Sequence, residues 1–155
     1  MIAIGTKAPE LNLFNQKRER VSLESLRGKK VVIAFFPAAF TSVCEKELCT
    51  FRDSLSALDD IGAAVLGISV DAPFANAAFA TKNNLNFPIL SDYAREATRA
   101  YGVAIDNFAG MPGYTASNRA VFVVNAEGTI TYSWVGPNPG VEPDYEEVKR
   151  AVAVA

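Results

Sequence analysis

Two continuous apolar runs and two alternating ones define the predicted strands in the first half of the chain. Residues 30–36 and 63–70 are rich in β-branched and aromatic side chains, a pattern typical of strands that are buried on both faces. Residues 11–14 and 20–23 flank a polar turn at residues 15–19. We therefore expect a short N-terminal β-hairpin followed by two buried strands.

Helical periodicity marks the segments that follow the buried strands and the end of the chain. Residues 42–59 carry an apolar stripe at helical spacing, formed by Leu48, Phe51, Leu55 and Leu58. Residues 73–83 begin with a proline, which is favourable in the first turn of a helix. Residues 144–154 form an amphipathic pattern, so we expect a closing helix there.

The stretch between these helices predicts shorter elements. Residues 87–90 form a short apolar run, and Ser91 or Asp92 is a good cap for a helix that extends to about Tyr101. Residues 107–118 contain three Gly or Pro residues and are expected to form a long loop.

A C-terminal hairpin completes the predicted architecture. Residues 119–124 and 129–135 flank a turn made by Asn-Ala-Glu-Gly. Together with the central strand–helix–strand unit, this order predicts an α/β protein with a mixed central sheet and helices on both faces. A thioredoxin-like fold fits the order best, and we expect residues 1–155 to form one domain.

Charge and hydropathy argue against nucleic-acid binding and membrane insertion. Fifteen basic residues balance seventeen acidic ones, which leaves no basic surface for nucleic acid and no polybasic membrane anchor. The longest apolar run, residues 31–40, is about half as long as a membrane-spanning helix. The first ten residues lack the pattern of a secretory signal. We therefore expect a cytoplasmic protein, where persistent structural disulfides are uncommon.

The absence of histidine restricts the chemistry that the chain can perform. It removes Ser–His and Cys–His nucleophile pairs and histidine-ligated zinc. The two cysteines, Cys44 and Cys49, are too few for a four-thiolate zinc site or a secreted disulfide framework. We expect neither a metal nor a cofactor, and chemistry carried by cysteine, arginine, lysine, tyrosine or carboxylates.

Cys44 lies where a helix should begin. Ser42 and Glu45 have the spacing of a capping box, and Thr41 is an alternative cap. Either choice places Cys44 in the first helical turn, where unpaired N–H groups and the helix dipole favour a thiolate. Cysteine is also a common small buried hydrophobe. The capping pattern alone therefore leaves a reactive and a structural role open.

The residues around Cys44 resemble the active-site motif of the peroxiredoxins. Pro37, Thr41 and Cys44 match the family signature Pro-x-x-x-Thr-x-x-Cys, directly after the predicted buried strand. The likeness extends from Gly-Thr-Lys-Ala-Pro at residues 5–9 to the final helix. Within the family, the sequence most resembles the Q-type branch, which includes the bacterioferritin comigratory proteins.

The resemblance implies a role for each matching residue. Cys44 would be the peroxidatic cysteine, whose thiolate attacks the peroxide and becomes a sulfenic acid. Thr41 would hydrogen-bond the thiolate and the peroxide, and Pro37 would shield the pocket from water. Arg119 would stabilise the thiolate and the leaving oxygen. Without the resemblance, Arg119 reads as a solvated charge at the end of a loop.

Three further residues receive roles from the same resemblance. Cys49 matches the resolving cysteine of many Q-type members, although it would otherwise read as a core residue. Its Cα should lie about 8–9 Å from that of Cys44 in a regular helix, whereas disulfides rarely span more than about 7 Å. Resolution would therefore require the helix to unwind. Glu47 would orient Arg119, and Phe40 would line the pocket or pack in the core.

The function implied by this resemblance is a thiol-dependent peroxidase acting on hydrogen peroxide and small organic hydroperoxides. Thioredoxin or a similar dithiol would recycle it, and the protein would be a monomer or homodimer. Two alternatives remain open at this stage. One is a one-cysteine peroxidase with an external resolving thiol, and the other is a thioredoxin-like redox sensor without turnover.

Overall fold

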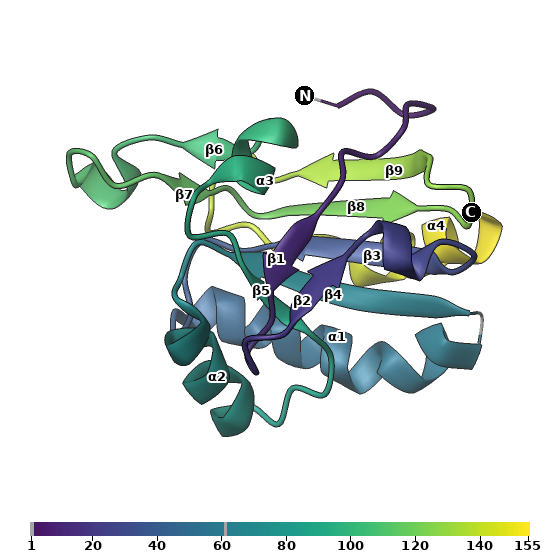
Figure 1. The fold of residues 1–155 in the computed structure, drawn as a ribbon, viewed down its shortest axis with the longest axis horizontal. Coiled ribbons are helices and arrows are strands. Elements are labelled where there is room, and N and C mark those ends of the chain that lie inside the picture. Colours follow the sequence, from purple (N-terminus) through teal and green to yellow (C-terminus); the bar gives the residue numbers. More distant parts are fainter. Residues whose placement is uncertain (1, 61) are drawn as a thin grey trace.

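The computed structural model, which describes residues 2–60 and 62–155, contains one seven-stranded mixed sheet (Figure 1). The strands of the sheet are β1 (Asn12–Phe14), β2 (Arg20–Ser22), β3 (Lys30–Phe35), β4 (Ala63–Ser69), β5 (Ile89–Ser91), β8 (Ala120–Val124) and β9 (Ile130–Val135). Their spatial order is β2-β1-β5-β4-β3-β8-β9. The neighbours β3, β4 and β5 are parallel, and every other pair in this sheet is antiparallel.

Both predicted hairpins are present, and the mixed sheet is confirmed. Strands β1 and β2 pair antiparallel with Leu13 opposite Val21, as the turn-flanked pattern predicted. Strands β8 and β9 form the C-terminal hairpin. A separate two-stranded sheet joins β6 (Ala104–Ile105) to β7 (Ala116–Ser117).

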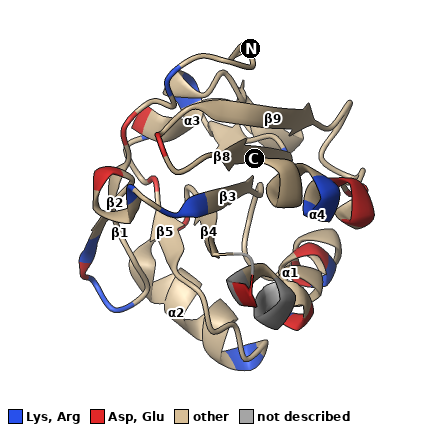
Figure 2. Cartoon of the chain, turned by 90° about the vertical axis from the view of Figure 1, so that its right-hand side faces the viewer, with Lys and Arg blue, Asp and Glu red and all other residues tan. Residues whose placement is uncertain are grey.

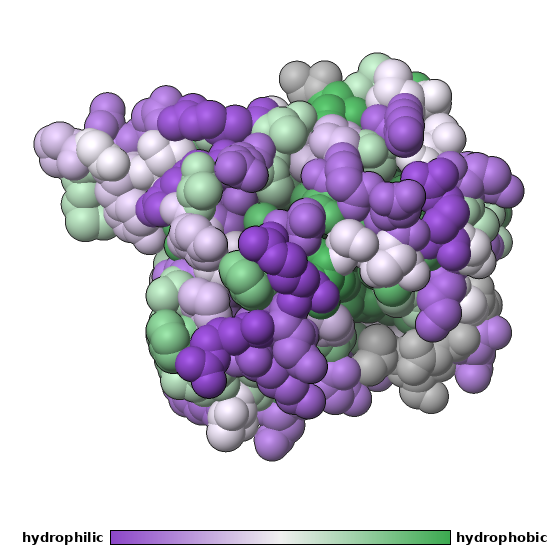
Figure 3. All heavy atoms as spheres, in the orientation of Figure 1, coloured by the Kyte–Doolittle hydropathy of each residue, from purple (hydrophilic) through white to green (hydrophobic). Residues whose placement is uncertain are grey.

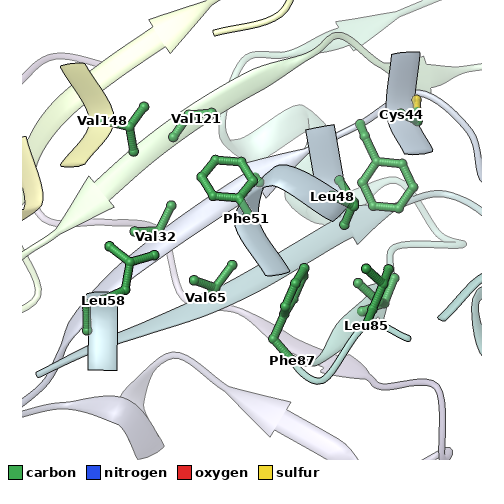
Figure 4. Close-up of a cluster of buried hydrophobic side chains, with 14 of the residues drawn as sticks. Val32, Cys44, Leu48, Phe51, Leu58, Val65, Leu85, Phe87, Val121 and Val148 are labelled. Carbon is green, nitrogen blue, oxygen red and sulfur yellow. The ribbon is translucent and has the colours of Figure 1, made fainter. Parts of the chain in front are cut away.

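Strand β3 is buried on both faces, which explains its continuous apolar sequence. Because side chains alternate along a strand, Val31, Ile33 and Phe35 enter one hydrophobic cluster and Val32 and Ala34 enter the other. The cluster that contains Val32 and Ala34 is covered by helices α1 (Ser42–Asp60) and α4 (Tyr145–Val154) (Figure 4) and by α2 (Pro73–Lys82). The cluster that contains Val31, Ile33 and Phe35 is covered by the N-terminal segment and by α3 (Glu96–Ala100). Helices therefore lie on both faces, as predicted.

The apolar stripe of α1 faces the sheet. Leu48, Phe51 and Leu58 are buried in the cluster beneath the helix, as the spacing predicted (Figure 4). The side chain of Leu55 lies outside the described residues. Packing this stripe against β4 and β3 fixes the position of the helix, and hence of the residues in its first turn.

Two predictions for the stretch after β5 were wrong. Helix α3 has only five residues and does not begin at Ser91 or Asp92, because Arg95 adopts a left-handed conformation with φ of 61°. The Asp92 carboxylate still caps it, accepting hydrogen bonds from the backbone N–H groups of Ala97 and Thr98. Residues 107–118, expected as a loop, contain strand β7 and a 3-10 turn at Phe108–Gly110.

The surface of the described residues carries charges of both signs, distributed around the molecule (Figure 2). Apolar residues are visible between polar ones on the face seen in Figure 3. A hollow of about 210 Å³ near β2 and β4 is lined mainly by apolar side chains, including Val21, Leu26 and Phe87. Within residues 2–60 and 62–155, no helix is both long enough and apolar enough to cross a membrane.

Gly67 in β4 provides a test of the packing beneath α1. A Cβ added there would lie 2.9 Å from Ile89 Cδ1 and 3.1 Å from Leu48 Cδ1. We expect Gly67→Ala to lower the free energy of unfolding by about 1–3 kcal/mol through overpacking, measured by urea denaturation. Gly140→Ala is the control, because it lies in an exposed loop where the added Cβ would meet only the side chain of the exposed Asn138, with 3.1 Å to its Oδ1. Equal midpoints for the two variants would show that this contact does not constrain α1.

Candidate active site

The loop between β3 and α1 is held by hydrogen bonds at two points. Ser117 donates from its hydroxyl to the carbonyl of Phe36 at 2.9 Å. The backbone N–H of Ala39 donates to Asp71 Oδ2 at 2.8 Å. Pro37, between these two anchors, is buried. The loop therefore leaves the sheet in a defined direction and delivers the chain to the start of α1.

Helix α1 begins directly after Thr41, which makes Thr41 the cap. The carbonyl of Thr41 accepts the first helical hydrogen bond, from the N–H of Glu45 at 2.9 Å. The carboxylate of Glu45 does not complete a capping box with Ser42; it accepts from Lys82 Nζ at 3.0 Å and from Asn83 Nδ2 at 3.4 Å. Cys44 occupies the first turn, as either choice of cap predicted.

Cys44 and Arg119 lie in direct contact. Cys44 is fully buried at one end of the cluster beneath α1 (Figure 4). Arg119 immediately precedes β8, and Ala120 pairs with Phe35 at the end of β3, so the fold brings the arginine to the edge where α1 starts. Its Nη2 donates to Cys44 Sγ at 3.1 Å. A charge-assisted contact of this kind stabilises a thiolate.

The guanidinium of Arg119 is fixed by two further contacts. Nη1 donates to Glu47 Oε1 at 3.1 Å, and Nε donates to the carbonyl of Pro139 at 3.0 Å. Arg119 and Glu47 are both almost completely buried. The segment between β9 and α4 therefore helps to hold the arginine, and Cys44 Sγ is the third of its three contacts.

Glu47 is, beside the Cys44 thiol, the second acidic group that contacts Arg119. Burial raises the pKa of Glu47 to about 8, although the charge and hydrogen bond of Arg119 act in the opposite direction. Its Oε2 has no hydrogen-bond partner among the described residues. One cation thus faces two acidic groups in a buried site, and ionisation of one opposes ionisation of the other. A protonated Glu47 leaves the charge of Arg119 available to the Cys44 sulfur.

Two of the residues assigned from the resemblance make contacts with groups other than the sulfur in this structure. The hydroxyl of Thr41 donates to the carbonyl of Ala38 at 3.1 Å. Phe40 is 47% exposed and packs its ring edge-on against Phe79, with centroids 5.4 Å apart. The roles of Thr41 toward a peroxide and of Phe40 in a pocket stay predictions.

Cys49 lies on the same helix as Cys44 but faces a different neighbour. Both cysteines are free, and Cys49 is partly buried, with its Sγ 3.5 Å from Asn83 Oδ1. Five residues in an α-helix correspond to a rotation of about 140° beyond one full turn. Because α1 is continuous through both positions, the two sulfurs approach bonding distance only if the first turns of α1 unwind.

Several residues that shape the site carry no signal in the motif. Asp71, Ser117 and the carbonyl of Pro139 contact the loop or Arg119 from three different segments, and Asn83 contacts Cys49. Only Asp71 has a recognisable pattern, a polar residue just after a buried strand. In the part of the chain that the structure describes, no cluster of three or more His, Cys, Asp or Glu side chains has the arrangement of a metal site.

The arrangement of a buried cysteine, an arginine and a helix start matches a known class of thiol enzymes. The model of the AhpC/TSA family matches residues 4–133, and the chain belongs to this family. Its relatives are peroxiredoxins, which are thiol-dependent peroxidases. The resemblance drawn from Pro37, Thr41 and Cys44 is thereby confirmed at the level of the family.

Two relatives with similar sequences point to one branch of that family. The chain is 43% identical to the bcp peroxiredoxin of Haemophilus influenzae over 130 residues, covering 83% of each protein. It is 38% identical to the chloroplastic peroxiredoxin Q of Gentiana triflora over 129 residues, covering 83% of this chain and 57% of the relative.

A solved structure of the same branch has the same fold. The bacterioferritin comigratory protein of Xanthomonas campestris, described for alkyl peroxide reduction, superposes with a TM-score of 0.82 at 25% identity. The match covers 93% of this chain and 90% of that protein. The thioredoxin-like fold predicted from the order of elements is therefore confirmed.

Proposed function

We propose that this chain reduces hydrogen peroxide and small organic hydroperoxides through Cys44, forms a Cys44–Cys49 disulfide, and is recycled by a thioredoxin-like dithiol. The observation that carries the proposal is the 3.1 Å contact between Arg119 Nη2 and Cys44 Sγ at the start of a helix. A buried cation and a helix N-terminus together favour a thiolate over a thiol.

In the first step, the Cys44 thiolate attacks one peroxide oxygen and the O–O bond breaks. The sulfur becomes a sulfenic acid, and the other oxygen leaves as hydroxide or alkoxide and takes up a proton. Arg119 faces this developing charge with a guanidinium already fixed by Glu47 and Pro139. Such a preorganised donor stabilises the transition state without a cost for reorientation.

The substrate class and the compartment follow from the same chemistry. The alkyl peroxide reduction described for the Xanthomonas relative supports small organic hydroperoxides as substrates beside hydrogen peroxide. A peroxidase that is recycled by a dithiol requires a reducing thiol pool, and we place this one in the cytoplasm.

The resolving role of Cys49 is supported by its place on α1 and by the resemblance to Q-type members. One observation favours a second candidate, a one-cysteine peroxidase with an external thiol. The contact between Cys49 and Asn83 keeps the Cys49 thiol away from Cys44 in the continuous helix. The two candidates differ in the product that wild-type protein forms after a single turnover.

Intact mass after one equivalent of hydrogen peroxide, without reductant, tests both candidates. We expect wild type to lose about 2 Da as a disulfide and Cys49→Ser to gain about 16 Da as a sulfenic acid. The variant should also lose turnover that depends on thioredoxin. A stable gain of about 16 Da in wild type would favour the one-cysteine enzyme. No mass change in either protein would contradict the peroxidase.

A further inference from the structure

One face of the C-terminal half of α2 packs along the segment that contains both cysteines. Phe79, Lys82 and Asn83 are spaced i, i+3 and i+4, so their side chains share one face of α2 and its end. Their partners include Glu45, Cys49 and Arg52, which share one face of α1 by the same rule. We call the group Phe79, Lys82 and Asn83 the α2 face.

The first part of the α2 face holds the loop and the first turn of α1. The ring of Phe79 packs against Phe40, and Lys82 Nζ lies 5.6 Å from the centroid of the Phe40 ring. The same Nζ forms an ion pair with Glu45 Oε1 at 3.0 Å. Lys82 thus bridges the residue just before the helix cap and the residue just after Cys44.

Asn83 holds the first three turns of α1 with three different groups. Its Oδ1 accepts from the Cys49 thiol at 3.5 Å, and its Nδ2 donates to Glu45 Oε1 at 3.4 Å. Its backbone carbonyl accepts from Nη1 of Arg52. Nδ2 also donates to the carbonyl of Phe79 at 3.1 Å, which orients the amide. Asn83 therefore contacts α1 at positions 45, 49 and 52.

We propose that the α2 face is a latch on the first turns of α1, which sets the rate at which Cys49 reaches the oxidised Cys44. This inference rests on the proposed resolving role of Cys49. The contacts of Lys82 and Asn83 exist only while residues 45–52 are helical. Unwinding must break them, so they oppose it, and Asn83 acts as a positioning residue that keeps Cys49 away from Cys44.

The step whose rate the latch sets is the condensation of the Cys49 thiol with the Cys44 sulfenic acid. The Cys49 sulfur attacks the Cys44 sulfur, the S–S bond forms and the S–O bond of the sulfenic acid breaks. The oxygen leaves with its own hydrogen and the thiol proton as one water molecule, so the step needs no other reactant. While the latch is closed, a second peroxide can instead oxidise Cys44 to the sulfinic acid. The latch therefore sets the ratio of disulfide to sulfinic acid.

The composition of the latch suits a helix that must open repeatedly. Its ion pair joins a largely exposed Lys82 to a partly exposed Glu45, and such pairs contribute little in water. The hydrogen bond of the Cys49 thiol is also weak, because a thiol is a poor donor. Several weak contacts on one helix face slow the opening without preventing it.

The test compares Lys82→Met and Asn83→Ala with wild type by rapid-quench intact mass. Lys82→Met keeps the alkyl stem and removes the charge. The control Lys149→Met removes a similar exposed ion pair, with Glu146, on α4. We expect Cys44 sulfenic acid to form at the wild-type rate in all three variants. Disulfide should form about fivefold faster in the two latch variants, with less sulfinic acid under excess peroxide.

A merely structural role would not change these two rates selectively. If Lys82 acts through Glu45, the double variant Glu45→Gln/Lys82→Met should form disulfide no faster than Lys82→Met alone. Disulfide rates equal to wild type in both latch variants would overturn the latch and leave the peroxidase intact. A wild type that stops at the sulfenic acid would overturn the resolving role and the latch together.

Discussion

Peroxide consumption by Cys44→Ser is expected to fall at least about a thousandfold, because serine offers no usable nucleophile at this position. The serine hydroxyl remains protonated at neutral pH even beside Arg119, whereas the thiol can ionise. The substitution is nearly isosteric and buried, so the fold should persist. The measurement is the disappearance of hydrogen peroxide with dithiothreitol as reductant, followed by the thermal unfolding midpoint of the same sample.

The matched control for this change lies on the same helix. Cys49→Ser replaces the other thiol with the same side chain, and we expect its first reaction with peroxide to proceed at the wild-type rate. Since dithiothreitol can reduce a sulfenic acid directly, this variant should still consume peroxide in the assay. Activity retained by Cys44→Ser would contradict the mechanism.

Arg119→Met is expected to slow the first step by about 10²–10³-fold. The variant keeps an unbranched side chain and removes the donors to Cys44 Sγ, Glu47 Oε1 and the carbonyl of Pro139. The sulfur then lacks its buried cation, so its alkylation by iodoacetamide at neutral pH should also be slower than in wild type. Burial already raises the pKa of Glu47, and without Arg119 this carboxyl should remain protonated.

The variant Arg119→Lys separates the charge of Arg119 from its geometry. Lysine supplies a cation but cannot reach all three partners with the planar fork of arginine. We expect its rate of peroxide reduction to lie between those of wild type and Arg119→Met, with the alkylation rate of Cys44 partly restored. If Arg119→Met keeps the wild-type rates of peroxide reduction and of alkylation and loses only stability to urea, the arginine holds the segment before α4 and does not activate the sulfur.

The elements that could be predicted are those whose cause is local. The central strands are predicted by their continuous apolar runs, and α4 is predicted by its amphipathic pattern. The structure adds a cap at Asp144, whose carboxylate accepts from two N–H groups of the helix. The start of α3 could not be predicted in this way, because it depends on the left-handed Arg95. Strand β7 exists through pairing with β6, and neither short segment has a strand pattern of its own.

The candidate site likewise contains residues whose position has a local cause in the sequence and residues whose position does not. The position of Cys44 in the first helical turn follows from the residues beside it. Arg119 is 75 residues away, and only the resemblance to a family indicated it. Asn83 is 34 residues from Cys49, and nothing in its neighbourhood distinguishes it from other polar residues at a helix end. Contacts that depend on packing between helices cannot be predicted from the local sequence and become visible only in the structure.

The backbone of Phe40 has a consequence for the energetics of the cycle. Its φ of 66° lies in the left-handed region, which is unfavourable for a bulky residue by about 1–2 kcal/mol. The contacts with Phe79 and Lys82 offset this strain while α1 is folded. In the proposed cycle, unwinding of the first turns of α1 would break these contacts, and Phe40 could then return to an ordinary conformation. The strain at Phe40 would therefore offset part of the cost of unwinding, and it would lower the free-energy difference between the folded and the unwound form of α1.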